Sequence, residues 1–271
     1  MKKILVLSAQ PWEFERDSIT QLSSRMGEYE FLHISPASVK GPFREYRFKR
    51  RLKRAVSRAE MILVSPAAYA GSLPPLGKPV RPLPDGVDFD RFSVPADLPV
   101  PAALAAIGAP VIGMNGAIDG DSNLIYIEKA AEAHPEWHFV FTGPVLTDLS
   151  GWDGYANIHL LSGVTDPPAW VNHFDVCINI TKNEDSSPVG LYEYLASGKP
   201  IVSTPHPAQV LDYTEAVYLA GTPEEFIACC KKAIGERDAW KTRRRVEYGR
   251  AASWEARTAE LEKILRELSN E

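Results

Sequence analysis

The stretch SSPVGLYEYLASGKPIVSTP, residues 186–205, contains a polar turn, a helical pattern and an apolar strand in immediate succession. Pro188 suits the first turn of a helix, where its missing N–H is not needed. Gly198 is a typical helix end, and the apolar run 201–203 follows almost at once. Another apolar run, 176–180, precedes the turn. A helix between two apolar strands indicates a parallel sheet with helices packed on it.

The same alternation of strand and helix continues along the chain. Stretches with helical spacing, such as 124–134 and 224–236, separate most of the short apolar runs. Several of these runs are apolar throughout, as expected for strands covered on both faces. The sequence therefore predicts an α/β protein of doubly wound, Rossmann-like parallel sheets. The predicted strands are Ile4–Ser8, Tyr29–Ile34, Met61–Ser65, Pro79–Leu83, Pro110–Asn115, Trp137–Thr142, Ile158–Leu161, Val176–Ile180, Ile201–Ser203 and Ala216–Leu219.

A proline-rich connector divides the chain. Residues 66–99 hold eight prolines, which can neither donate to a sheet nor continue a helix. We therefore predict a reduced N-terminal domain over 1–86, a larger domain over 87–250, and a C-terminal helix over 251–271.

The overall composition excludes several classes of protein. The 271 residues carry a formal net charge of −5, which argues against nucleic acid as a partner. Three cysteines without framework spacing are expected to be reduced in a cytosolic setting. The first apolar run, Ile4–Leu7, is too short for a signal peptide, and no run approaches the ~20 apolar residues of a membrane span.

In a doubly wound sheet, ligands bind beyond the carboxyl ends of the strands, so the loops there are the candidate site. The first loop, in IGMNGAIDGDSN (112–123), has Gly116, whose small size lets a ligand approach the backbone. The second, in VFTGP (140–144), offers Thr142 and Gly143, although an ordinary turn explains it as well.

The third loop leads into the helix of the opening stretch. Ser186 or Ser187 can cap that helix, and its free backbone amides can bind a phosphate. Asp185 lies in the loop and Glu193 on the helix, separated by seven residues. Glu193 has mostly apolar neighbours, so we expect it to be held for a partner such as a ribose diol rather than on a solvated face.

The order of several segments resembles the nucleotide-sugar-binding half of GT-B glycosyltransferases, in the large retaining group called family 4. The resemblance covers about residues 61–268, and its acid-x7-acid motif falls on Asp185 and Glu193, with Asp in place of the more usual first Glu. The segments are LPDGVDFDRF (83–92), VIGMNGAI (111–118), HPEWHFVFTGP (134–144), NIHLLSGV (157–164), FDVCINI (174–180), the opening stretch extended by one residue to Asp185 (185–205), and ASWEARTAEL (252–261).

The resemblance implies a role for each matching position. Asp185 and Glu193 would be the catalytic pair: Glu193 would hold the ribose hydroxyls of a nucleoside diphosphate sugar, and Asp185 would face the transferred sugar. Gly163 and Val164 would meet the base, and the loop 8–11 would close the cleft. No metal or other cofactor is implied, because amides and basic side chains stabilise the leaving diphosphate. The other donor-binding positions would be Gly116, Thr142, Gly143, Lys182, Ser186, Ser187, Pro188, Val189, Gly190 and Leu191.

Two features depart from the family pattern. Asp119 and Asp121 occupy the first loop, where a basic residue is usual, so Lys182 is the candidate substitute. Asp119 and Asp121 also mimic a metal-binding pair, but acids paired in a turn are common and Mg²⁺ needs more ligands. The N-terminal half is short, and His33 is interpreted as a core or surface residue rather than a catalytic one.

A basic segment, REYRFKRRLKRAVSR (44–58), has an apolar stripe at helical spacing. Such a helix can pack on a core with a solvated basic face, or lie on anionic lipid head groups. The second reading implies a protein at the cytoplasmic inner leaflet.

The sequence thus favours a retaining glycosyltransferase that moves a sugar from a nucleoside diphosphate sugar to a glycan or lipid-linked acceptor. The alternative is a non-catalytic or partner-dependent protein of the same fold that binds a nucleotide or a membrane. A nucleotide-sugar epimerase is a weaker option, because it needs acid–base side chains from both domains.

Overall fold

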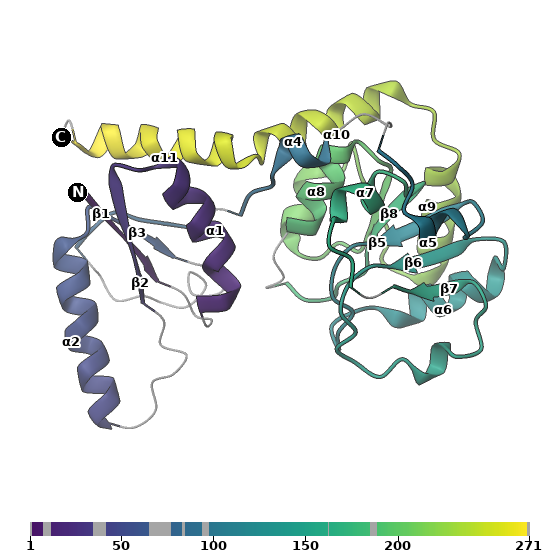
Figure 1. Ribbon diagram of the computed structural model, residues 1–271, viewed down its shortest axis with the longest axis horizontal. Helices are drawn as coiled ribbons and strands as arrows, with labels where there is room; N and C mark the ends of the chain where they lie inside the picture. The colour runs from purple at the N-terminus through teal and green to yellow at the C-terminus, as the bar shows by residue number, and fades with distance from the viewer. Residues whose placement is uncertain are drawn as a thin grey trace. The chain divides into compact units, whose positions relative to one another are not determined.

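The computed structural model describes residues 2–7, 12–34, 42–64, 77–82, 85–93, 98–161, 163–184 and 189–269 (Figure 1). The chain forms two compact units. Unit 1 combines Met1–Gly86 with Trp254–Glu271, and unit 2 is Val87–Ser253. The C-terminal helix therefore belongs to the same unit as the N-terminus.

Unit 1 is built on a parallel sheet with the strand order β2-β1-β3-β4. Helices cover both of its faces, because alternate residues of a strand point to opposite sides. Ile4 and Val6 pack with helices α1 and α11, whereas Leu5 and Leu7 pack with α2. The elements are β1 (Lys2–Leu7), α1 (Trp12–Arg25), β2 (Tyr29–Ile34), α2 (Pro42–Arg58), β3 (Met61–Val64), β4 (Val80–Pro82) and α11 (Trp254–Ser269).

Unit 2 contains a parallel sheet with the order β10-β9-β8-β5-β6-β7. If β5–β10 are numbered 1–6 and the sheet is read from β7, the order is 3-2-1-4-5-6, which is that of a dinucleotide-binding fold. The strands are β5 (Val111–Met114), β6 (His138–Phe141), β7 (Ile158–Leu160), β8 (Val176–Asn179), β9 (Ile201–Ser203) and β10 (Tyr218–Leu219).

Helices lie on both faces of the second sheet, and two apolar clusters fill the space between the layers (Figure 1). Ile112 and Phe139 pack with α6 and α9, whereas Val111 and Cys177 pack with α4, α7 and α8. The helices are α4 (Phe89–Phe92), α5 (Ala102–Ala105), α6 (Leu124–Ala133), α7 (Pro167–Val171), α8 (Val189–Ser197), α9 (Pro223–Ile234) and α10 (Ala239–Ala251), with 3₁₀ turns η1 (Ser150–Trp152) and η2 (Ala208–Tyr213).

The predicted fold class is confirmed, since all ten predicted strands occur in the described residues and all pair in parallel. All three cysteines are free. Among the described residues, no helix combines the length and the apolar character needed to cross a membrane.

Candidate functional site

The candidate site lies where the order of strands in unit 2 reverses. Strand β5 pairs with β8 on one side and β6 on the other, so the loops after β5 and β8 diverge from a common point at the carboxyl edge. A cavity of about 250 Å³ opens there. Its lining residues are Met114, Asn115, Gly116, Ala117, Asp119, Ser122, Ile178, Asn179, Ile180, Thr181, Gly190, Leu191, Tyr194 and Pro207.

Asn115, the residue directly after β5, connects three elements around this cavity. Its side-chain Nδ2 donates to Glu193 Oε2 at 2.9 Å, and its Oδ1 accepts from Thr142 Oγ1 at 3.2 Å. Its backbone N–H donates to the Tyr194 hydroxyl at 2.8 Å, and that hydroxyl donates to the Asn115 carbonyl at 3.2 Å. The end of β5 is therefore fixed to α8 and to the loop after β6.

Glu193 lies on α8, one residue before the buried Tyr194. Burial raises the pKa of Glu193 to about 7, although the hydrogen bond from Asn115 and the charge of Arg91 act in the opposite direction. Within the described chain, Oε1 accepts no hydrogen bond, so one carboxylate oxygen remains for a ligand. Glu193 does not itself line the cavity, but it is bonded to Asn115, which does.

The start of α8 also faces the cavity. Gly190 and Leu191 line it, and a Cβ on Gly190 would lie 3.8 Å from the Asn115 carbonyl oxygen. The first N–H groups of a helix have no partner within the helix, which makes this end suitable for an anion. Val189 is the first helical residue. The candidates Asp185, Ser186, Ser187 and Pro188 lie outside the described residues.

Two glycines let the loops after β5 and β6 come together. A Cβ on Gly143 would stand 1.9 Å from the Gly116 carbonyl oxygen, so no larger residue fits there. Gly116 has a φ of +151°, which L side chains rarely adopt. Gly116 lines the cavity, whereas Thr142 and Gly143 do not. They contact two residues that do: Thr142 bonds to Asn115, and Gly143 packs against Gly116.

The acidic loop is tied to the loop after β8. Asp121 Oδ2 accepts from Asn183 Nδ2 at 2.9 Å, and the backbone N–H of Lys182 donates to the Asp121 carbonyl at 2.9 Å. Asp119 Oδ1 accepts from the Asp121 N–H at 3.0 Å and from the Ser122 hydroxyl at 3.3 Å. Asp119 lines the cavity, and Lys182 is exposed beside it.

The remaining candidates lie further along the same edge. Gly163, with a φ of +77°, and Val164 follow β7, two strands away from β5, and neither lines the cavity. The same loop continues to Asp166, which pairs with Arg91 of α4 at 3.1 Å. The structure thus brings Gly116, Gly190, Leu191 and Glu193 together, but not Gly163 and Val164.

Sequence reasoning missed Asn115 and Tyr194 as site residues. The available signal was the position of Asn115 at the end of an apolar run and before a glycine. It also missed the pair formed by Glu184 and His206, in which Nδ1 lies 2.6 Å from Oε1. Nothing in the spacing of these two residues indicates that they meet.

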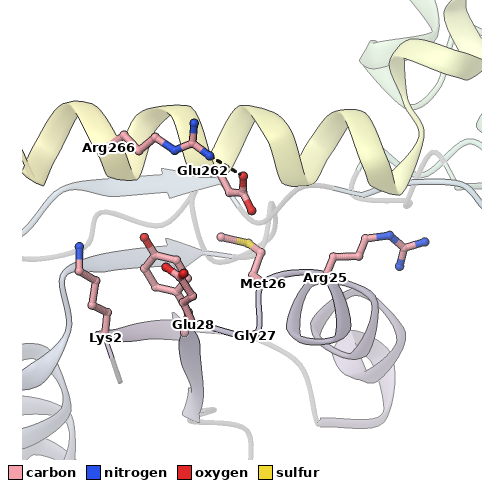
Figure 2. A pocket seen from close by; sticks show the side chains of 8 residues that line it. Lys2, Arg25, Met26, Gly27, Glu28, Glu262 and Arg266 are labelled. Carbon is pink, nitrogen blue, oxygen red and sulfur yellow. Dashed lines mark hydrogen bonds and ion pairs between the residues drawn. The ribbon is translucent and has the colours of Figure 1, made fainter.

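A larger cavity, of about 570 Å³, lies in unit 1 (Figure 2). Lys2 begins β1 and Gly27 precedes β2, so this cavity is at the amino end of the sheet, opposite the edge where ligands bind. Its cations have acidic partners: Arg266 pairs with Glu262, and Arg25 pairs with Glu255 at 2.7 Å. We therefore assign the candidate site to the smaller cavity.

Sequence comparison relates unit 2 to a known family. The family described as "Glycosyl transferases group 1" matches residues 108–236, which include the β5 and β8 loops. A Bacillus subtilis (strain 168) protein named "Putative teichuronic acid biosynthesis glycosyltransferase TuaH" is 29% identical over 194 residues, or 65% of this chain. The chain spans about half the length of that relative, 48% of it.

Solved structures share the fold of the whole chain. A glycosyltransferase from Rickettsia africae ESF-5 superposes with a TM-score of 0.68 at 12% identity, covering 98% of each chain. Anabaena Alr3699/HepE, solved in complex with UDP-glucose, gives 0.64 at 13% identity and covers 98% of this chain and 100% of its own. Residues 108–236 thus resemble the group 1 glycosyltransferases, and the chain as a whole has the fold of GT-B glycosyltransferases of known structure.

Proposed function

We propose that unit 2 binds a nucleoside diphosphate sugar, and that the protein transfers the sugar to a glycan or lipid-linked acceptor with retained anomeric configuration. The observation that carries this proposal is the carboxyl-edge cavity, where the start of α8 and the Asn115–Glu193 pair meet. The α8 amides would bind the diphosphate, and Glu193 would accept hydrogen bonds from the ribose diol. Asp185 would face the transferred sugar.

The relatives agree with a donor of this class. HepE was crystallised with UDP-glucose, and the name of TuaH refers to the biosynthesis of teichuronic acid. We extend to this chain a role in polysaccharide biosynthesis in the cytoplasm. We propose that it works without a metal or other cofactor, since backbone amides and basic side chains can stabilise a leaving diphosphate.

Donor binding and donor hydrolysis test this function directly. Wild-type protein is titrated with UDP, GDP and their glucose conjugates, and slow hydrolysis of the conjugates is followed without acceptor. We expect Glu193→Ala to weaken nucleotide-sugar binding at least tenfold, because a carboxylate with two diol hydrogen bonds contributes about 1.5–3 kcal/mol. Glu132→Ala, on the exposed face of α6, is the matched control. If wild-type protein showed no binding and no hydrolysis, the proposal would be refuted.

One observation favours the alternative, a protein of the same fold that binds a nucleotide without transferring a sugar. Asp119 lines the cavity, and its carboxylate would repel a diphosphate. The two functions differ in a measurable way. The alternative predicts nucleotide binding that Glu193→Ala abolishes, with no hydrolysis or transfer from any bound sugar nucleotide.

We propose the anionic inner leaflet as a second partner, contacted through α2. Ala55 is buried against the sheet of unit 1, while Arg50, Arg51, Lys53 and Arg54 are exposed. A basic helix face of this kind is attracted to anionic lipid, by about 1 kcal/mol per cation near the surface. Co-sedimentation with phosphatidylglycerol vesicles should exceed that with phosphatidylcholine and fall when the four cations become Gln. Equal sedimentation with both lipids would contradict the proposed contact between α2 and anionic lipid.

A further inference from the structure

The candidate donor cavity lacks a cation among its described lining residues. Its charged lining residue is Asp119, and the remaining lining residues are apolar or neutral. Transfer of a sugar leaves negative charge on a diphosphate, which proteins stabilise with preorganised donors or cations. Positive groups are therefore expected at the rim, where the exposed Lys182 is one candidate and a second lies on the loop after β9.

The Glu184–His206 pair is at that rim. His206 immediately precedes Pro207, which lines the cavity, and its carbonyl accepts from Asn179 Nδ2 at 3.0 Å. Asn179 is the last residue of β8 and lines the cavity too. The pair thus lies between the loops that follow β8 and β9, and Glu184 is on the loop that leads to α8.

Glu184 orients the imidazole, and the backbone of Ala208 in turn holds Glu184. Nδ1 lies 2.6 Å from Glu184 Oε1, and Glu184 Oε2 accepts from the Ala208 N–H at 3.1 Å. An ionised carboxylate can only accept, so the pair is a hydrogen bond when Nδ1 carries the proton. Within the described chain, no protein atom forms a hydrogen bond with Nε2 of His206. An imidazole protonated at both nitrogens keeps the Glu184 bond and offers Nε2–H to an anion.

We propose that His206 donates a hydrogen bond from Nε2 to the diphosphate of the donor nucleotide, and that Glu184 positions the ring for this contact. The inference rests on the proposed function, because it needs a nucleoside diphosphate in the cavity. With both ring nitrogens protonated, His206 would place a positive charge at the rim of the cavity, between the loops that follow β8 and β9.

Comparison of a diphosphate with a monophosphate tests this role in the full-length protein. UDP and UMP are titrated into wild type, His206→Asn and Glu184→Gln, with GDP and GMP used if wild type prefers guanosine. We expect His206→Asn to weaken diphosphate binding about tenfold or more and to leave monophosphate binding within twofold, since a hydrogen bond to a charged group is lost. Glu184→Gln should show a smaller loss, again confined to the diphosphate.

The chain provides a matched control for the loss of an imidazole–carboxylate pair. His134 Nδ1 lies 2.9 Å from Glu136 Oε1, between α6 and β6 at the amino edge of the sheet. His134→Asn should change neither affinity. His206→Gln serves as a second variant, so that the outcome does not depend on how well one replacement folds.

The results separate this inference from the donor site itself. An equal loss of both affinities in the His206 variants would overturn the inference and make the pair a purely structural link. Unchanged diphosphate affinity would overturn it as well, while leaving the donor site intact. Failure of wild type to bind any of the four nucleotides would overturn the donor site together with this inference.

Discussion

Asn115 shows how one side chain determines the geometry of the candidate site. Its amide group donates to Glu193 and accepts from Thr142, while its backbone is bonded at both polar atoms to the Tyr194 hydroxyl. The carboxyl end of β5 therefore cannot move without breaking contacts to α8. Rigid placement of this kind is what binding a diol and a diphosphate in one geometry requires.

The pKa of Glu193 leads to a prediction about stability and pH. Burial raises that pKa from 4.5 to about 7. Below pH 4.5 the carboxyl is protonated in folded and unfolded chains alike. Between pH 4.5 and about 7, Glu193 loses its proton in the unfolded chain but keeps it in the folded one, so the folded state becomes less stable as the pH rises.

Glu193→Gln should remove this cost while keeping an oxygen that accepts from Asn115. We expect the variant to be more stable than wild type by about 1–3 kcal/mol at pH 8, with no difference near pH 4.5. Its affinity for a nucleotide sugar at pH 8 should fall at the same time. Urea unfolding at the two pH values measures the first effect. A variant less stable than wild type at pH 8 would contradict it, and Glu132→Gln controls for an exposed glutamate.

Tyr194→Phe should destabilise the site through the backbone of Asn115. The change removes the hydroxyl that bonds both the N–H and the carbonyl of that residue, and an unsatisfied buried backbone group costs about 1–3 kcal/mol. Urea unfolding should show this loss, together with weaker nucleotide binding. Tyr155→Phe, in a loop before β7, is expected to change neither quantity. Equal effects of the two substitutions would show that the hydrogen bonds between the Tyr194 hydroxyl and the Asn115 backbone do not stabilise the site.

The elements were easier to predict from sequence than the contacts between them. Strands β5 and β8 are short apolar runs bounded by turn residues, and this local pattern is enough to identify them. The bond from Asn115 to Tyr194 joins residues 79 apart in the chain and depends on the strand order, which no local pattern encodes. The assignments to Asp185 and the 186–188 turn stay predictions, because those residues lie outside the described ones.

Close packing of α8 on α10 gives a prediction at the level of elements. A Cβ on Gly249 would lie 2.5 Å from the Cα and backbone nitrogen of Ala196, so α10 must shift to accept any side chain. We expect Gly249→Ala to destabilise unit 2 by about 1–3 kcal/mol and to weaken nucleotide binding, because α8 carries Glu193. Thermal unfolding with and without nucleotide measures both effects.

Gly154→Ala is the control for this substitution. No atom lies within 4 Å of the added Cβ there, and the residue is exposed. Its stability should stay within about 0.5 kcal/mol of wild type, as is usual for surface positions. If Gly249→Ala were equally neutral, the helices would have to be less closely packed than the structure indicates.

At the scale of the whole molecule, the C-terminal helix completes a unit that the N-terminus begins. Trp254, Leu261 and Leu265 of α11 are at most 5% exposed and pack with Ile4 and Leu22 of unit 1. A Cβ on Gly86 would lie 2.7 Å from the Trp254 ring, so the last residue of the N-terminal segment also depends on this helix. The stability of unit 1 thus requires both ends of the chain.

Truncation after Ser253 should therefore unfold unit 1 and leave unit 2 folded. Each of the three side chains contributes about 1.5–3 kcal/mol by burial, and together they approach the 5–15 kcal/mol that stabilises a typical domain. Hydrogen exchange should show that the amides of β1 and β3 lose protection, while those of β5 and β8 keep it. Removal of residues 267–271 alone, which leaves the three side chains in place, should preserve both patterns. In the variant truncated after Ser253, protected amides in β1 would contradict the dependence of unit 1 on α11. Loss of amide protection in β5 would contradict the independent stability of unit 2.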